Sequence, residues 1–236
     1  MIFLILTFVF LFSPVCANEY NLYSPQNFRL KSEGADKILF IVDFSNSMTE
    51  YLNNERKVDV MLDTLRSIIS KIDSNTQLGL RVYGHKGGIT AFDACKASTL
   101  MVPIASSNSV NIIDALGRLN PRGMTPITYS LKQAVKKDFL GVRGNKRIIL
   151  LTDGGENCDE SPCDYVMELI TVRKDIHIDV IAFNVQDEED LAQLECTAMV
   201  TSGKFYTANT AAELVRSLDN SLQDNKKVEG IIINND

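Results

Sequence analysis

The sequence predicts an α/β fold: a doubly wound, mainly parallel central sheet with one antiparallel edge strand and helices on both faces. Two continuous apolar runs, at 38–42 and 148–151, are typical of strands that are buried on both faces. In the second half of the chain, segments with helical periodicity alternate with strand-like segments, and this alternation favours a parallel sheet. Pro103 lies in the extended run 98–104, which predicts an edge strand because proline donates no backbone hydrogen bond.

The first half of the chain predicts a helix and a second strand after the run 38–42. The helix is indicated by apolar residues at helical spacing, namely Val58, Met61, Leu62, Leu65, Ile68, Ile69 and Ile72. Leu78, Leu80 and Val82 then alternate with polar residues, which is the pattern of a half-exposed strand. A glycine-bearing loop leads from there to the extended run 98–104.

The second half of the chain predicts the remaining elements in alternation. Helices are expected near 107–119, over 126–139, from 161, over 187–202 and from 210, and strands over 147–152, 176–182 and 203–206. Ser161 followed by Pro162 and Asp164 has the pattern of a capping box with proline at the first helical position. Thr210 with Glu213 predicts a cap for the last helix.

The predicted organisation is one domain over 36–224, with segments that need separate treatment at both ends. Residues 2–12 form an apolar stretch that is short for a membrane span, and small residues at Val15 and Ala17 suit signal-peptide cleavage. We therefore expect a signal peptide over 1–17, an amino-terminal extension over 18–35 and a tail over 225–236. The alternative is a retained membrane anchor, in which case the uncleaved signal would be the one contact with a membrane.

Charge and cysteine content narrow the class of protein further. The formal net charge of −6 disfavours nucleic acid as a partner. Removal of the signal would leave four cysteines, Cys95, Cys158, Cys163 and Cys196, an even number that favours two disulfides in an exported chain. A zinc site is disfavoured because there is no second closely spaced cysteine pair, and the chain has two histidines in unrelated segments.

Oxygen-bearing side chains follow two of the predicted central strands. Asp43, Ser45 and Ser47 come directly after the run 38–42, and Asp153 follows the strand 147–152. Ligands of open α/β sheets bind at the carboxyl ends of the strands, where these residues would meet. Two carboxylates in that place would repel each other unless a cation lies between them. Hydroxyl and carboxylate oxygens suit Mg²⁺, Mn²⁺ or Ca²⁺.

These residues resemble the metal-ion-dependent adhesion site of von Willebrand factor type A domains. That site combines Asp-x-Ser-x-Ser, a distant Thr and a distant Asp, which stand here as Asp43-Phe44-Ser45-Asn46-Ser47, Thr125 and Asp153. The resemblance covers roughly 36–222. The stretches around Gly84, Thr125 and Asp153 are similar to a bacterial exported branch of the family.

The resemblance implies an exported protein-binding module rather than an enzyme. In the family these side chains hold a divalent ion, here expected to be Mg²⁺, whose open position takes a Glu or Asp from a partner protein. No nucleotide is expected, because the motifs of phosphate-binding loops, hydrolase elbows and zinc peptidase helices are missing from the sequence. Two alternatives stay open: a metal-assisted phosphoesterase that uses the same site, and a structural envelope protein with a vestigial site.

Each site residue also has a local explanation. Ser45, Ser47 or Thr125 could cap a following helix, and Asp153 could form a turn with Gly154. Which carboxylate borders the site after Asp153 is open, because Gly155 stands where the branch often has Glu and Glu156 follows. His85, Lys86 and Arg122 are candidates for a rim that attracts an acidic ligand.

The family's strand order also implies a disulfide pairing. In that order Cys95 and Cys196 lie on opposite flanks of the sheet, which favours Cys95 with Cys158 and Cys163 with Cys196. Both bridges would then hold the loop after Asp153 beside the site.

Overall fold

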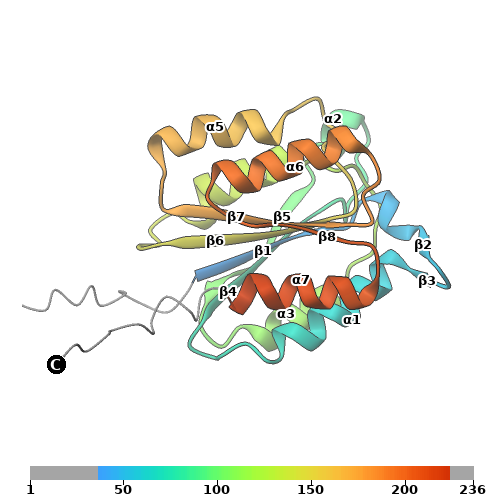
Figure 1. The fold of residues 1–236 in the computed structure, drawn as a ribbon, viewed down its shortest axis with the longest axis horizontal. Helices are drawn as coiled ribbons and strands as arrows, with labels where there is room; N and C mark the ends of the chain where they lie inside the picture. Colours follow the sequence, from blue (N-terminus) through green and yellow to red (C-terminus); the bar gives the residue numbers. More distant parts are fainter. Residues whose placement is uncertain (1–36, 224–236) are drawn as a thin grey trace, which may run out of the picture. The chain divides into compact units, whose positions relative to one another are not determined.

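Residues 37–223 are described by a computed structural model, and they build a six-stranded sheet with helices on both faces (Figure 1). The strand order is β5-β4-β1-β6-β7-β8, in which β5 alone runs antiparallel to its neighbour. These strands are β1 (Lys37–Asp43), β4 (Gln77–Tyr83), β5 (Ser98–Ala105), β6 (Lys146–Thr152), β7 (Ile176–Phe183) and β8 (Phe205–Ala208). The predicted fold class is confirmed. The signal peptide, the extension and the tail lie outside the described residues.

Helices pack on the sheet as two separate layers, which makes the fold doubly wound. They are α1 (Lys57–Ile69), α2 (Ala91–Ala94), α3 (Ser109–Leu116), α4 (Ile127–Gln133), α5 (Pro162–Val172), α6 (Glu188–Val200) and α7 (Ala211–Gln223). In Figure 1, α5 and α6 lie above the sheet while α1, α3 and α7 lie below it. A π-helical segment, Ala134–Asp138, continues α4.

The two faces of β1 belong to two different cores. Phe40 and Val42 pack with apolar residues of α1, α3 and α7, whereas Leu39 and Ile41 pack with those of α4, α5 and α6. Successive side chains of a strand point to opposite faces, so a strand between two helical layers must be apolar at every position. This requirement explains the unbroken apolar run 38–42.

The predicted caps form at the expected helix ends. The Ser161 hydroxyl accepts a hydrogen bond from the Asp164 backbone N–H at 3.1 Å, with Pro162 as the first residue of α5. The Thr210 hydroxyl accepts one from the Glu213 N–H at 3.2 Å ahead of α7. Each cap satisfies a backbone donor that the first turn of a helix leaves without a partner.

The prediction that β4 is half exposed is wrong. Six of its seven residues are buried, including Arg81, which is 4% exposed. The Arg81 guanidinium donates to both carboxylate oxygens of Asp138, at 2.6 and 2.7 Å, and to the Ser98 hydroxyl at 2.9 Å. Polar residues in a strand indicate exposure only when no partner from another element covers them. Here Asp138 covers Arg81.

Short elements near the carboxyl edge of the sheet were not predicted. A hairpin of β2 (Tyr51–Leu52) and β3 (Glu55–Arg56) precedes α1, and α2 lies in the loop between β4 and β5. In Figure 1 both lie at the right-hand end of the domain. Elements of two to four residues carry too little periodicity to be read from sequence.

Both predicted disulfides are present. Cys95 pairs with Cys158 and Cys163 pairs with Cys196, each with a Cα–Cα distance of 5.5 Å. The first bridge joins the loop after α2 to the loop after β6, and the second joins α5 to α6. Within residues 37–223, no helix is both long enough and apolar enough to cross a membrane.

We expect Arg81→Met to lower the free energy of unfolding by about 3–5 kcal/mol, because it leaves the carboxylate of Asp138 buried without a partner. The matched control is Arg66→Met, which removes an exposed pair with Asp63 and should cost about 1 kcal/mol or less. Urea denaturation of both variants measures the difference. Equal, small losses would show that Asp138 does not depend on Arg81.

Candidate metal centre

Asp43 is fully buried at the carboxyl end of β1. Its Oδ1 accepts a hydrogen bond from the Ser45 backbone N–H at 2.6 Å, and its Oδ2 accepts one from the Thr152 hydroxyl at 2.9 Å. Because β1 pairs with β6 in parallel, Thr152 arrives at the same edge of the sheet as Asp43. The carboxylate is therefore fixed by groups from two adjacent strands.

Asp153 lies one residue beyond β6 and is connected to the serine pair after β1. The Ser47 hydroxyl donates to Asp153 Oδ1 at 2.6 Å, and the hydroxyl oxygens of Ser45 and Ser47 are 2.9 Å apart. The other oxygen of Asp153 accepts from Lys57 Nζ at 3.1 Å. The structure thus brings four of the five predicted residues into one continuous network.

Both carboxyl groups have raised pKa values. Burial and, after it, the negative charge of Asp153 raise the pKa of Asp43 to about 7. Burial also raises the pKa of Asp153, against the lowering effects of Ser47 and Lys57. Burial therefore disfavours ionisation of both groups, and positive charge at this edge of the sheet would favour it.

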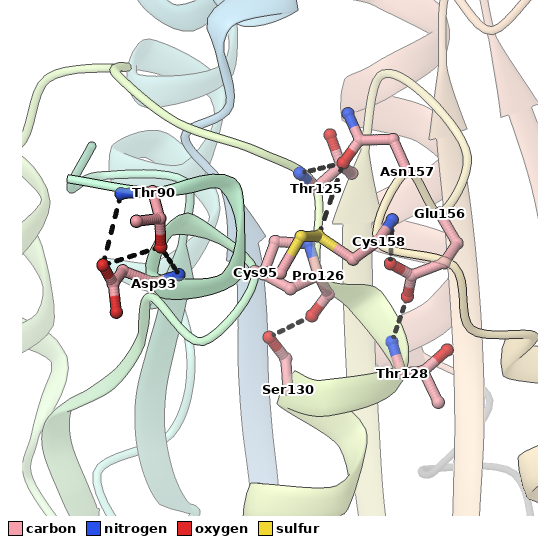
Figure 2. The surroundings of a disulfide bond; sticks show 10 residues. All are labelled: Thr90, Asp93, Cys95, Thr125, Pro126, Thr128, Ser130, Glu156, Asn157 and Cys158. Carbon is pink, nitrogen blue, oxygen red and sulfur yellow. Dashed lines mark hydrogen bonds between the residues drawn. A yellow bond between two sulfur atoms is a disulfide. The ribbon is translucent and has the colours of Figure 1, made fainter. Parts of the chain in front are cut away.

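Thr125, the fifth predicted residue, is 3% exposed and lies on the loop between α3 and α4. Gly123 accepts a backbone hydrogen bond from Asn46 N–H at 3.0 Å and forms a bridge with Ser45. The Thr125 N–H donates to Asn157 Oδ1 at 2.6 Å (Figure 2). These contacts bring the Thr125 loop to both strand ends.

Close backbone approach holds the loop after β1, the loop after β4 and the Thr125 loop together. Gly84 has a φ of +70°, and a Cβ there would lie 2.4 Å from the Ser45 nitrogen. A Cβ on Gly123 would lie 2.5 Å from the carbonyl oxygen of Lys86. The Arg122 N–H donates to the carbonyls of both Phe44 and Gly84, at 3.1 and 2.9 Å. Glycine at 84 and 123 therefore allows the loops to pack closely enough to share hydrogen bonds.

The local explanations for the site residues do not match these contacts. Ser45 precedes the short 3₁₀ helix η1 (Asn46–Thr49), but its side chain makes no capping hydrogen bond. The residue ahead of α4 is Pro126 rather than Thr125, again without a side-chain cap. Asp153 bonds Ser47 and Lys57, which are far from it in sequence. Ser47 and Asp153 thus serve a contact between two loops rather than a local turn.

The three predicted rim residues differ in position. Lys86 and Arg122 are exposed. His85 is 8% exposed, and neither ring nitrogen has a hydrogen-bond partner in residues 37–223. Burial, together with the charge of Lys86, lowers the pKa of His85 to about 4. His85 is therefore buried and neutral near pH 7, and a rim role for the three residues stays a prediction.

Sequence reasoning left the role of Glu156 open and missed Asn157, and both residues support the site. Glu156 accepts from the Thr128 N–H at 2.7 Å and from the Cys158 N–H at 3.0 Å, so its carboxylate serves the start of α4 (Figure 2). Asn157 holds the Thr125 backbone, and the disulfide Cys95–Cys158 lies beside both contacts. Such contacts cross between loops and have no periodic signal in sequence.

The donor set fits a hard cation. It consists of hydroxyl and carboxylate oxygens from the loops after β1 and β6, and its two carboxyl groups have pKa values that a nearby positive charge would lower. In the described part of the chain, no three His, Cys, Asp or Glu residues come together as a metal cluster. Of the five predicted ligands, three are neutral hydroxyls and two are carboxyl groups.

Comparison with curated proteins finds a relative in Bacillus subtilis strain 168. The uncharacterized protein YwmD is 25% identical over 203 residues, which are 84% of this chain and 89% of YwmD. The two chains therefore correspond over nearly their whole lengths.

Solved structures share the fold at lower identity. Proximal thread matrix protein 1 from the mussel byssus, with a zinc-occupied MIDAS motif, superposes with a TM-score of 0.63 at 21% identity, over 81% of this chain and 46% of that chain. The pilus adhesin SpaC from Lactobacillus rhamnosus GG has a TM-score of 0.63 at 14% identity, over 81% of this chain and 30% of that chain. This chain thus spans less than half of either protein.

Comparison with protein families matches residues 37–220 to the von Willebrand factor type A domain. This match extends from β1 into α7 and includes every loop of the candidate site. The chain belongs to the von Willebrand factor type A domain family.

Proposed function

We propose that this chain is an exported protein-binding module that uses a divalent metal ion, Mg²⁺ in the first instance, to engage an acidic side chain of a partner protein. One observation carries the proposal: the Ser47 hydroxyl joins the Ser45 hydroxyl to Asp153, so that oxygen atoms from two strand ends meet in one network.

The metal would be held by Asp43, Ser45, Ser47, Thr125 and Asp153. A bound divalent ion supplies a concentrated positive charge that can accept one further oxygen ligand. Three of the five side chains are neutral hydroxyls, so the ion would keep much of its charge. A carboxylate from outside is the ligand that such an ion attracts most strongly.

Four features support export and protein binding. The apolar stretch 2–12 with small residues at its end is typical of secretory signals, and the two disulfides are typical of oxidising compartments. The similar SpaC is a pilus adhesin, and a role in adhesion would agree with the proposal. Exposed Lys86 and Arg122 add positive charge near the site despite the net charge of −6.

We expect the wild-type chain to bind Mn²⁺ or Mg²⁺ and Thr125→Ala to reduce the affinity by about tenfold or more, because one oxygen donor is lost. The control, Thr171→Ala, alters an exposed residue at the end of α5 and should leave the affinity unchanged. Isothermal titration calorimetry measures both. Equal affinities of wild type and Thr125→Ala would show that Thr125 is not a metal ligand.

Asp43→Asn should change metal-free stability in a pH-dependent way. The pKa of Asp43 is about 7 in the folded chain against an ordinary 3.8, so the protonated form favours folding, and this stabilisation is lost as pH rises through 7. Relative to wild type in chelator, the free energy of unfolding of the Asn variant should rise by up to about 4 kcal/mol between about pH 4 and pH 8. Urea denaturation across this range measures the gain, and a pH-independent difference would contradict it.

Capture from an envelope extract tests the proposed function. We expect the immobilised chain to retain a partner in Mg²⁺, to release it in chelator, and to lose it in Asp43→Ala. Retention of the partner that is unchanged by chelator and by Asp43→Ala would favour a structural role with a vestigial site. Turnover of generic phosphoesters with Mg²⁺, abolished by Asp43→Ala, would favour a hydrolase instead.

A further inference from the structure

Lys57 is a buried cation inside the candidate metal centre. It is the first residue of α1 and is 4% exposed. Its Nζ lies 3.1 Å from Asp153 Oδ2 and 2.8 Å from Glu50 Oε2. The Asp153 side chain is fully buried, whereas that of Glu50 is 65% exposed. The ammonium group therefore connects a site carboxylate to one at the surface.

The position of Lys57 is unfavourable for the helix that contains it. The amino end of a helix carries a partial positive charge, which repels a cation in the first turn. Burial of an ammonium group also removes its hydration. A lysine ammonium is ordinarily protonated at neutral pH, and both Glu50 and Asp153 accept a hydrogen bond from it. The favourable contacts of Lys57 are thus with the site.

A count of formal charges shows what Lys57 changes. Ionised Asp43 and Asp153 carry −2 together, and Lys57 reduces this to −1. A divalent ion would bring the three residues to +1 with Lys57 and to 0 without it. Lys57 therefore replaces part of the metal's charge when the metal is absent and repels the metal when it binds.

We propose that Lys57 is an internal counter-cation of the metal centre: it stabilises the metal-free site through Asp153, weakens metal binding, and makes the loaded site one charge more positive for an acidic ligand. This inference rests on the proposed function, and it assigns to one residue the balance between metal retention and attraction of the partner's carboxylate.

Lys146 provides a matched control. It is also buried, with its Nζ 2.6 Å from Asp175 Oδ2, but it lies at the start of β6, at the opposite end of that strand from Asp153. Lys146→Met removes a buried ammonium group of the same kind without changing the charge of the metal centre. Lys57→Arg keeps the charge at position 57.

The experiment measures Mn²⁺ affinity by calorimetry and metal-free thermal stability in chelator. We expect both Met variants to melt at lower temperature than wild type, and Lys57→Met alone to bind Mn²⁺ about tenfold more tightly, with Lys57→Arg close to wild type. Glu50→Gln, which removes an exposed negative charge, should weaken Mn²⁺ binding by about twofold. A Lys57→Met chain that folds only when Mn²⁺ is present would also support the proposal.

Two results separate this inference from the proposed function. If wild type takes up no Mn²⁺, the proposed function is contradicted. If wild type binds Mn²⁺ and Lys57→Met binds it equally or more weakly, or fails to fold even with Mn²⁺, Lys57 has a structural role only and the inference is overturned while the metal site stands.

Discussion

Two carboxyl groups, those of Asp43 and Asp153, are buried at the ends of adjacent parallel strands, and the rest of this edge of the domain is arranged around them. The strands cannot move apart, because β1 and β6 lie in the middle of the sheet with helices on both sides. Their side chains therefore meet whatever the cost of repulsion. Hydroxyls of Ser47 and Thr152, the Ser45 N–H and the Lys57 ammonium all donate to these carboxylates. Each of these contacts favours the ionised form of a carboxylate.

A site of this kind depends on loops that hold their positions before a ligand arrives. The backbone of Gly84 lies against Ser45, that of Gly123 lies against Lys86, and Arg122 N–H is shared between two of the loops. On the other side, Asn157 holds Thr125 and the disulfide Cys95–Cys158 joins the loops after β4 and β6. Preorganised donors do not have to be ordered on binding, which favours affinity for a small cation.

Sequence reasoning succeeded where a regular geometric rule applies. Asp43, Ser45, Ser47 and Asp153 could be brought together in advance, because carboxyl ends of neighbouring parallel strands share one edge. It failed where contacts depend on side-chain reach between irregular segments. Lys57 could not be assigned to the site, because the unpredicted hairpin β2–β3 sets where α1 begins. Burial of Arg81 and His85 was missed for the same reason: partners and covering loops are properties of the tertiary structure.

Anomalous diffraction from a crystal grown with Mn²⁺ tests the central claim most directly. The account predicts one strong peak at the carboxyl edge of the sheet, within coordination distance of the Ser45 and Ser47 hydroxyls and flanked by Asp43, Thr125 and Asp153. A crystal with Mn²⁺ bound elsewhere, or with Lys57 Nζ filling the space between the two carboxylates at saturating Mn²⁺, would contradict it.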